Sequence, residues 1–152
     1  MSRVIFLDID GVLNGHQWCH TKRGPRILPG PAGILDILLE RSQPKVVLIS
    51  SWRRWLHDGH MTLKGFERLL LSHGVHATIR DALPARDAKL SHAKDRTLKI
   101  RQWLDFFRPQ AYVVLDDLPL EVDHLIRPNP AVGLAPPHIT EAMKMFEGQE
   151  NP

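Results

Sequence analysis

Short apolar runs alternate along the chain with longer segments in which apolar residues recur every three or four positions. Short runs of β-prone residues are typical of strands buried on both faces, whereas the longer spacing predicts helices with one buried face. The runs predict strands at 3–8, 45–50, 75–79, 111–116 and 124–127. Strands that alternate with helices in this way indicate a mainly parallel sheet covered on both faces.

Proline and glycine set the limits of the predicted helices. The first helix begins near Pro31, which suits a first helical turn, and Pro44 ends it. A second is predicted at 62–73, with Gly74 as its stop. A third carries its apolar face within 100–107, ahead of Pro109, and a last one is predicted at 140–146. Residues 82–95 have the composition of a loop.

These elements describe one α/β domain. The expected fold is a single Rossmann-like three-layer domain with a mainly parallel sheet of about five strands and no large cap domain. A chain of 152 residues suffices for one hydrophobic core and not for a second. We expect the domain to span residues 1–147, with a frayed tail at 148–152.

Composition narrows the class of protein. Cys19 is the single cysteine, so no disulfide can form within the chain. No apolar run approaches the roughly 18 residues of a membrane span, and the first residues do not resemble a secretory signal. We therefore expect a soluble cytoplasmic protein.

Positive charge is concentrated in the middle of the chain. The formal net charge is +3, but residues 41–108 hold 14 basic and 6 acidic side chains, a local net of +8 that leaves −5 for the rest. A basic middle suits an anionic partner such as a phosphorylated or nucleic-acid substrate. A solvated basic face without a ligand explains the same charge equally well.

Acidic and hydroxyl side chains directly follow three of the predicted strands. Asp8 and Asp10 follow the first, the serine pair 50–51 the second, and the aspartate pair 116–117 a later one. Ligands of such sheets bind beyond the carboxyl ends of the strands, so these groups are expected to converge. Converging carboxylates need a neutralising charge, which Mg²⁺ supplies through its preference for oxygen ligands. The candidate ligands are Asp8, Asp10, and Asp116 or Asp117.

This set of residues suits phosphoryl transfer. A carboxylate beside Mg²⁺ can attack phosphorus, and a second carboxylate two residues on can protonate the leaving oxygen and then activate water. Gly11 would let the backbone approach the phosphoryl oxygens, and Ser50 supplies a hydroxyl donor. The Asp-x-Asp-Gly run is also compatible with a simple turn after the strand. An EF-hand loop is excluded, because the glycine stands at the wrong position for one.

The run FLDIDGVLN at 6–14 closely resembles the first motif of the haloacid dehalogenase (HAD) superfamily of phosphohydrolases. LIS at 48–50 matches the second motif of that superfamily, and VLDD at 114–117 matches the fourth. The whole chain also resembles the small capless branch found as a domain in multi-part RNA-repair proteins. The segments that carry this second resemblance are SSWR at 50–53, the spacing of Arg96, Ile100, Trp103 and Leu104, YVVLDD at 112–117, and AVGL at 131–134.

The resemblance implies a role for each matched acidic residue. Asp8 corresponds to the nucleophile that becomes phosphorylated, and Asp10 to the general acid and base. Mg²⁺ would be held by the Asp8 carboxylate, the Asp10 backbone carbonyl and Asp116. Asp117 would act through water or as a supporting partner. An acid at position 10 favours phosphatase over dehalogenase chemistry.

The resemblance also implies contacts to the phosphoryl group. Ser50 would bind it, with Ser51 as a rival by one residue. The cation of the third motif is assigned to Arg96, which lies four residues before Ile100 where the branch usually carries arginine. Lys94 and Lys99 compete for this role, and Lys99 is disfavoured because it lies on the helix face opposite Trp103.

The intervals between the motifs leave no room for a sizeable cap. By the resemblance, capless members act more often on exposed phosphates of large molecules, which favours nucleic-acid ends (a 3′-phosphate) and a place beside nucleic-acid repair enzymes. His16, Trp18 and Arg53 are possible substrate contacts, since aromatic and basic side chains stack on bases and track phosphates. Open alternatives are a nucleoside monophosphate phosphatase, a phosphotransferase, and a non-catalytic module that binds nucleic acid or phosphate.

Overall fold

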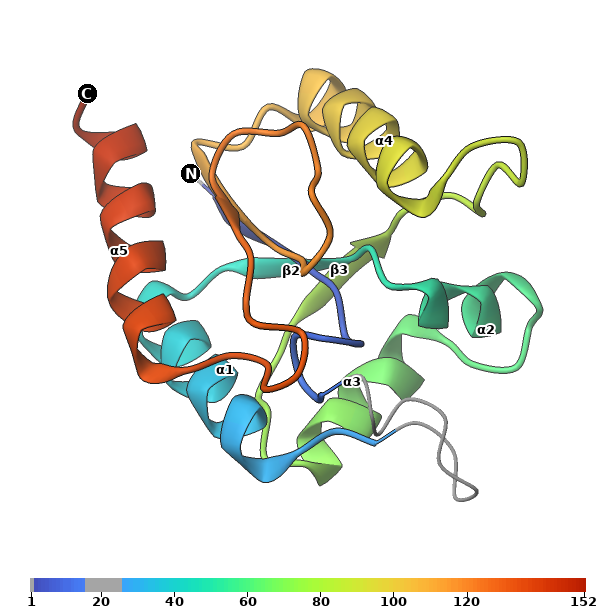
Figure 1. Ribbon diagram of the computed structural model, residues 1–152, viewed down its shortest axis with the longest axis horizontal. Helices are drawn as coiled ribbons and strands as arrows, with labels where there is room; N and C mark the ends of the chain where they lie inside the picture. The colour runs from blue at the N-terminus through green and yellow to red at the C-terminus, as the bar shows by residue number, and fades with distance from the viewer. Residues whose placement is uncertain (1, 16–25) are drawn as a thin grey trace.

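The computed structural model describes residues 2–15 and 26–152 of the chain (Figure 1). Strands and helices alternate along almost its whole length. Its elements in chain order are β1 (Arg3–Leu7), α1 (Pro29–Ser42), β2 (Lys45–Leu48), the 3-10 helix η2 (Ser51–Arg53), α2 (Arg54–His57), α3 (Leu63–Ser72), β3 (Ile79–Ala82), α4 (His92–Phe107), β4 (Ala111–Leu115), β5 (Leu125–Ile126) and α5 (Pro136–Glu150).

The strands form one five-stranded sheet in the order β3-β2-β1-β4-β5, and every neighbouring pair is parallel. The chain builds the sheet outward from β1 to β3, and α4 then carries it back to the other side of β1. The strand order therefore reverses between β1 and β4, which is where parallel α/β sheets bind their ligands. The fold class predicted from the sequence is confirmed.

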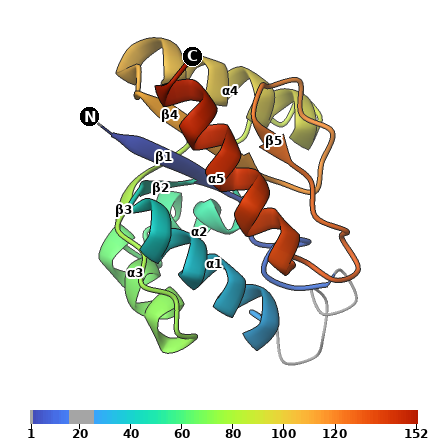
Figure 2. The ribbon, with the colours of Figure 1, turned by 90° about the vertical axis from the view of Figure 1, so that its left-hand side faces the viewer.

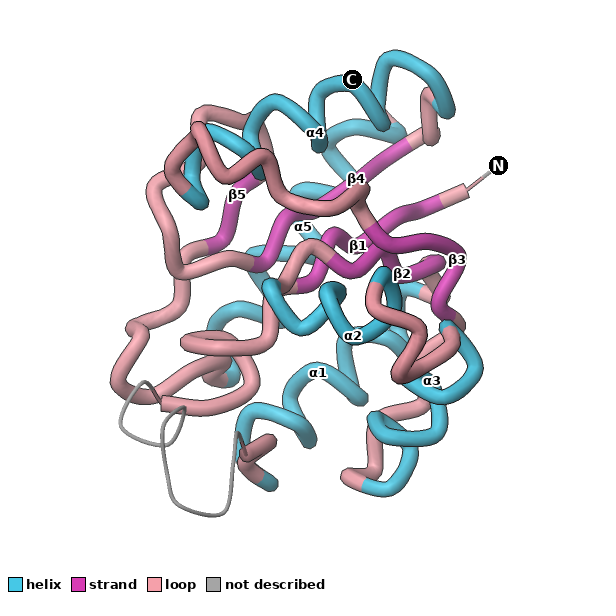
Figure 3. The backbone as a smooth tube through the Cα atoms, turned by 90° about the vertical axis from the view of Figure 1, so that its right-hand side faces the viewer, coloured by secondary structure: helices cyan, strands magenta, loops and turns pink. Residues whose placement is uncertain are grey.

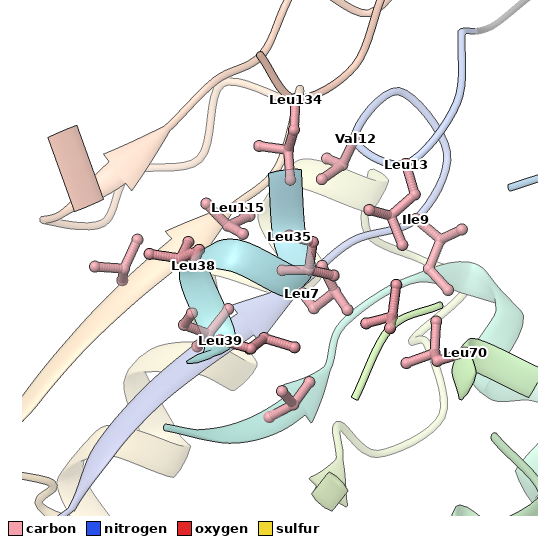
Figure 4. Close-up of a cluster of buried hydrophobic side chains, with 14 of the residues drawn as sticks. Leu7, Ile9, Val12, Leu13, Leu35, Leu38, Leu39, Leu70, Leu115 and Leu134 are labelled. Carbon is pink, nitrogen blue, oxygen red and sulfur yellow. The ribbon is translucent and has the colours of Figure 1, made fainter. Parts of the chain in front are cut away.

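Side chains of each strand alternate between two apolar layers. On one face Ile5 and Leu7 of β1 pack in a cluster with residues of α1, α3 and α5. On the other face Val4 and Phe6 pack with Ile100 and Trp103 of α4. Figure 2 shows α1 and α5 side by side on the first face, and Figure 4 shows leucines of α1 above β1 and β4. Two buried layers hold the sheet rigidly, so the strand ends are fixed in position.

The region around β3 differs from the predicted elements. The strand occupies Ile79–Ala82 rather than 75–79, because the amide of Val75 closes the end of α3 on the Leu70 carbonyl. The Glu67 carboxylate then accepts the Ile79 amide at 2.8 Å as the chain enters the sheet. The loop predicted at 82–95 ends early, since Ser91 caps α4 through a 3.2 Å bond from the Lys94 amide.

The last helix is longer than the sequence predicts. It runs over Pro136–Glu150 instead of 140–146, and its first residue is a proline, which suits the start of a helix. Residues 148–150, expected to begin a frayed tail, belong to this helix in the structure. Gln149 bonds both the amide and the carbonyl of Tyr112, and Glu150 pairs with Arg3 at 2.6 Å. These long-range contacts hold the last turn against the sheet.

No helix among the described residues combines the length and apolar composition needed to cross a membrane.

Gly133 marks a close crossing between the loop after β5 and the turn after β1. Its φ is +83°, and a Cβ there would lie 2.7 Å from the Val12 carbonyl oxygen. We expect Gly133→Ala to lower the free energy of unfolding by about 2–4 kcal/mol. An alanine would be strained in this left-handed backbone conformation, and its Cβ would also displace the Val12 backbone. Gly74 is the matched control, since its φ is +81° with nothing within 4 Å, and Gly74→Ala should cost about 1 kcal/mol. Equal losses for the two variants in urea unfolding would contradict the close crossing.

Candidate active site

Three buried carboxylates meet at the point where the strand order reverses. Asp8 follows β1 and Asp116 and Asp117 follow β4, with exposed fractions of 2%, 0% and 9%. Backbone hydrogen bonds extend the sheet through Asp8 and Asp116. The Asp8 amide donates to the Leu115 carbonyl, and the Asp116 amide donates to the Ile126 carbonyl. One oxygen from each of the three carboxylates lies within 4.8 Å of the others. The strand-end rule therefore placed these residues together.

Arg96 is the cation that reaches this acid cluster, which is formed by Asp8, Asp116 and Asp117. It lies in the second turn of α4, and its Nη1 is 2.8 Å from Oδ2 of Asp116 and 3.3 Å from Oδ2 of Asp8. Lys99 instead bonds the Asp95 carboxylate and the Ala85 carbonyl, and Lys94 is exposed. Of the three cations weighed from the sequence, only Arg96 contacts the acid cluster among the described residues.

The acid cluster carries more negative charge than Arg96 can balance. Burial raises the pKa of Asp8 well above its ordinary value, and repulsion from Asp116 raises it further while Arg96 opposes both. Burial also raises the pKa of Asp116, again against the attraction of Arg96. Burial disfavours the charge on Arg96, but the charges of Asp8 and Asp116 raise its pKa overall. Full ionisation of the cluster therefore requires a further positive charge.

The donor set of the acid cluster fits Mg²⁺. No hydrogen-bond donor among the described residues reaches Oδ1 of Asp8, although this atom is buried. An unpartnered buried carboxylate oxygen costs free energy unless a cation binds it. Oxygen ligands alone match the preference of Mg²⁺. Asp8, Asp116 and Asp117 are thus the side chains that could hold the ion.

Asp10 lies beside this group rather than in it. Its Oδ2 accepts a 3.0 Å bond from the indole Nε1 of Trp52, and its Oδ1 accepts a 3.1 Å bond from Nδ2 of Asn14. Asp10 was among the candidate carboxylate ligands of the strand-end argument, whereas the resemblance implied a role for its backbone carbonyl alone. Its carboxylate does not belong to the group of three that could hold a metal ion among the described residues. Two donors from different segments hold it at the edge of the site.

Gly11 shapes the turn that carries Asp10. Its φ is +82°, in the left-handed region that favours glycine. Its amide donates a hydrogen bond to Oδ1 of Asn14 at 3.0 Å, so this N–H group is already engaged within the turn. The structure thus gives Gly11 a role in the turn, and the contact predicted between its backbone and a phosphoryl group stays a prediction.

Ser50 and Ser51 take different positions. Ser50 is buried, and its Oγ caps η2 by accepting the Trp52 amide at 3.2 Å, which leaves the hydroxyl proton as the group it can donate. Ser51 is half-buried and lines a pocket beside the site. Figure 3 views the molecule from the side on which α2 lies, with η2 and α2 next to the ends of β1 and β2.

Arg53 is engaged by internal partners, and its predicted contact with the substrate stays a prediction. It is buried, and its guanidinium donates to the carbonyls of Ile49 and Pro84 and pairs with Asp95 at 2.9 Å. Asp95 also binds Lys99, so Arg53 belongs to an ion network that ties η2 to α4. His16 and Trp18, the other substrate contacts predicted from the sequence, lie outside the described residues.

Sequence reasoning assigned no role to Asn14, Trp52 or Asp95. Asn14 and Trp52 both fall in runs that carried the resemblance, but their bonds to Asp10 join residues 4 and 42 positions apart. The Arg53–Asp95 pair likewise spans 42 positions. No local periodicity encodes such contacts, so only the fold reveals them.

Comparison with models of protein families gives a match. A family model described as "HAD domain in Swiss Army Knife RNA repair proteins" matches residues 4–139 of the chain. The match covers all five strands except Arg3, the first residue of β1, and it includes the site residues named above. A search of curated proteins finds none that matches the chain.

Proposed function

Because this chain belongs to the family of HAD domains in Swiss Army Knife RNA repair proteins, a family of phosphohydrolase type, we propose that it is a Mg²⁺-dependent phosphatase acting on phosphorylated nucleic-acid ends. The observation that carries the proposal is the acid cluster with Arg96 bound to it, next to the separately held Asp10. A nucleophile and a nearby acid are the two groups that an aspartyl-phosphate mechanism needs.

In the first half of the proposed reaction an oxygen of Asp8 attacks phosphorus. The bond from phosphorus to the ester oxygen breaks, and Asp10 donates a proton to the departing alcohol. In the second half Asp10 takes a proton from water, whose oxygen attacks the phosphoryl group and releases Asp8 and inorganic phosphate. Mg²⁺ bound by Asp8, Asp116 and Asp117 would act as a Lewis acid that offsets the charge of the transferred group.

The remaining residues of the site support these steps. Arg96 stands beside Asp8 and balances part of the charge that the phosphoryl group brings. Ser50 can donate its hydroxyl proton to a phosphoryl oxygen, and Trp52 and Asn14 hold Asp10 in place. Burial of Asp8 keeps water from competing for its carboxylate.

The proposed substrate class rests on the family and on the short segment between β2 and β4. Between β2 and β4 the described chain holds only β3, η2, α2, α3 and α4, so no inserted domain covers the site from this part of the chain. A phosphate at the end of a large molecule could therefore approach. The family description names RNA repair, which favours an RNA end, with the 3′-phosphate as the proposed group.

A substrate panel tests the proposed function. Phosphate release is measured, with Mg²⁺ and with a chelator, from oligonucleotides phosphorylated at the 3′ or 5′ end, nucleoside monophosphates, sugar phosphates and a phosphoserine peptide. We expect Mg²⁺-dependent release that is fastest from 3′-phosphorylated RNA. Faster release from nucleoside monophosphates would favour a nucleotide phosphatase instead. Salt-sensitive RNA binding without release would indicate a binding module and contradict the proposal.

Trp52→Phe tests whether the indole positions Asp10. The variant keeps an aromatic ring against Trp55, at a 5.1 Å centroid distance in the native protein, but loses the donor to Asp10. We expect kcat to fall about fivefold to tenfold with little change in KM, because one orienting hydrogen bond is lost. Trp55→Phe is the matched control, and kcat should be unchanged in it. A parallel loss in both variants, together with a lower Tm, would indicate that Trp52 acts only through packing.

A further inference from the structure

A pocket of about 260 Å³ lies directly beside the proposed phosphoryl site. It begins one residue from Ser50, because Ser51 is part of its wall. Three segments that are distant in the sequence form the wall: η2 with α2, the loop after β3, and the first residue of α4. The lining residues are Ser51, Arg53, Arg54, His57, Asp58, Ala85, Arg86 and His92.

Basic side chains outnumber acidic ones in the wall of this pocket. Three arginines and two histidines face a single aspartate, Asp58. Arg53 is committed to its internal partners, so the exposed Arg54 and Arg86 are the cations available to a ligand. Arg86 is held in place by a 2.7 Å bond from its Nη2 to the Leu90 carbonyl. His57 is held by a 3.0 Å bond between its Nε2 and the Leu83 carbonyl.

Cations of the pocket and of the proposed active site both act on the His92 imidazole. Partial burial lowers the pKa of His92, and the charges of Arg86, Arg96 and Arg53 lower it further. Arg96 contacts the acid cluster and Arg86 lines the pocket. The His92 imidazole is therefore close to cations of the pocket and of the proposed active site. A group that binds here with negative charge would relieve this concentration of positive charge.

The pocket is large enough to hold one part of a ligand and too small for a complete one. Its volume of about 260 Å³ falls below the ~300–1,000 Å³ typical of sites for whole small molecules. An anionic group joined to the reacting phosphate through one nucleoside fits both the size and the charge. Arginines recognise phosphate oxygens through paired hydrogen bonds and are suited to this role.

We propose that this basic pocket binds a second phosphate of the substrate, one nucleoside away from the phosphate that is removed. The inference rests on the proposed function and extends it, since it makes the enzyme select substrates with two phosphate groups. The second phosphate can be the neighbouring phosphodiester of a strand or the second monoester of a small bisphosphate. Arg54 and Arg86 bind it, and His92 lies next to it.

Kinetics with three substrates tests the selection. The substrates are a nucleoside 3′-monophosphate, the 3′,5′-bisphosphate of the same nucleoside, and a dinucleotide with a terminal 3′-phosphate. We expect a higher kcat/KM for the two doubly phosphorylated substrates than for the monophosphate. Arg54→Ala and Arg86→Ala should each lower this preference about threefold, and the double variant about tenfold, as expected for exposed charged contacts.

Arg41→Ala is the matched control, because this exposed arginine lies in the last turn of α1 before β2 begins, at the opposite end of the sheet. It should keep the native preference. A preference for the dinucleotide alone would assign the pocket to a phosphodiester, whereas equal preference for the bisphosphate would assign it to any second phosphate. Native preference in the double variant would overturn the proposal.

A binding measurement separates this proposal from the proposed function. The Asp8→Asn protein with Mg²⁺ is titrated with the bisphosphate and with the monophosphate while the His92 imidazole is followed by NMR. We expect the bisphosphate to raise the pKa of His92 and the monophosphate to change it less. An unchanged His92 in bisphosphate-saturated protein would overturn the pocket assignment. A shifted His92 in a protein whose wild type releases no phosphate would contradict only the proposed function.

Discussion

Asp8→Asn is expected to lower kcat for phosphate release by at least about 10³-fold, because an amide cannot act as the nucleophile that the proposed reaction requires. The substitution keeps the shape of a side chain that is 2% exposed, so the fold should persist. Release from the best substrate of the panel measures the loss. Asp105→Asn, an exposed position on α4, is the matched control and should keep native turnover. Substantial turnover in Asp8→Asn would contradict the role of Asp8.

The same substitution has an expected effect on stability with a definite sign. The pKa of Asp8 is raised in the folded protein, so its ionisation costs stability as the pH rises from its ordinary value toward the raised one. Asparagine carries no such cost. Without divalent cations at pH 8, Asp8→Asn should therefore be more stable than the wild type, by about 1 kcal/mol or more in urea unfolding. Mg²⁺ should stabilise the wild type more than the variant and reduce this difference.

Arg96→Ala is expected to lower the free energy of unfolding by about 3–5 kcal/mol at pH 8, because it leaves the acid cluster without its buried counter-charge. The Arg96 side chain is 7% exposed and its guanidinium contacts both Asp8 and Asp116, so solvent cannot replace it. Phosphate release should fall as well, since the group that offsets the phosphoryl charge is gone. Urea unfolding and the phosphate assay measure the two losses.

The pH dependence of the Arg96→Ala loss provides a second check. Burial raises the pKa of Asp8 and Asp116, so both take up protons as the pH falls and their uncompensated charge disappears. The loss should therefore be smaller at pH 5 than at pH 8. Lys94→Ala, on the exposed face of the same helix, should change stability by less than about 0.5 kcal/mol at either pH. A loss in Arg96→Ala that is independent of pH would indicate a packing role alone.

The sheet could be predicted because its strands are buried on both faces and therefore apolar along their length. Val4 through Leu7 and Val113 through Leu115 are fully buried, and the shortness and β-prone residues of these runs favour strands over helices. The errors lie where tertiary contacts decide. Val75 is apolar because it packs beside α3 and not because it belongs to a strand. The last turn of α5 persists because Arg3, at the other end of the chain, pairs with Glu150.

The sequence alone predicted those parts of the candidate site that directly follow the strands of the sheet. Parallel pairing of β1 with β4 makes their carboxyl ends adjacent, and this brings Asp8 and Asp116 together. The resemblance to the family, rather than the strand ends, assigned Arg96, and in the structure this residue is buried on α4 together with Ile100 and Trp103. The bond from Trp52 to Asp10 depends on how η2 turns after Ser50, and the run of residues at 50–57 holds no periodicity that predicts this.

Trapping a phosphorylated protein tests the central claim, that the carboxylate at the end of β1 accepts the phosphoryl group. The enzyme is mixed with Mg²⁺ and its best substrate, quenched in acid within one turnover, and treated with borohydride, which reduces an acyl phosphate to the alcohol of homoserine. Peptide mass spectrometry then locates the modified residue. The mechanism predicts homoserine at position 8 in the wild type and none in Asp8→Asn. Phosphate release without any modification at position 8, and undiminished in Asp8→Asn, would contradict it and indicate direct attack by water.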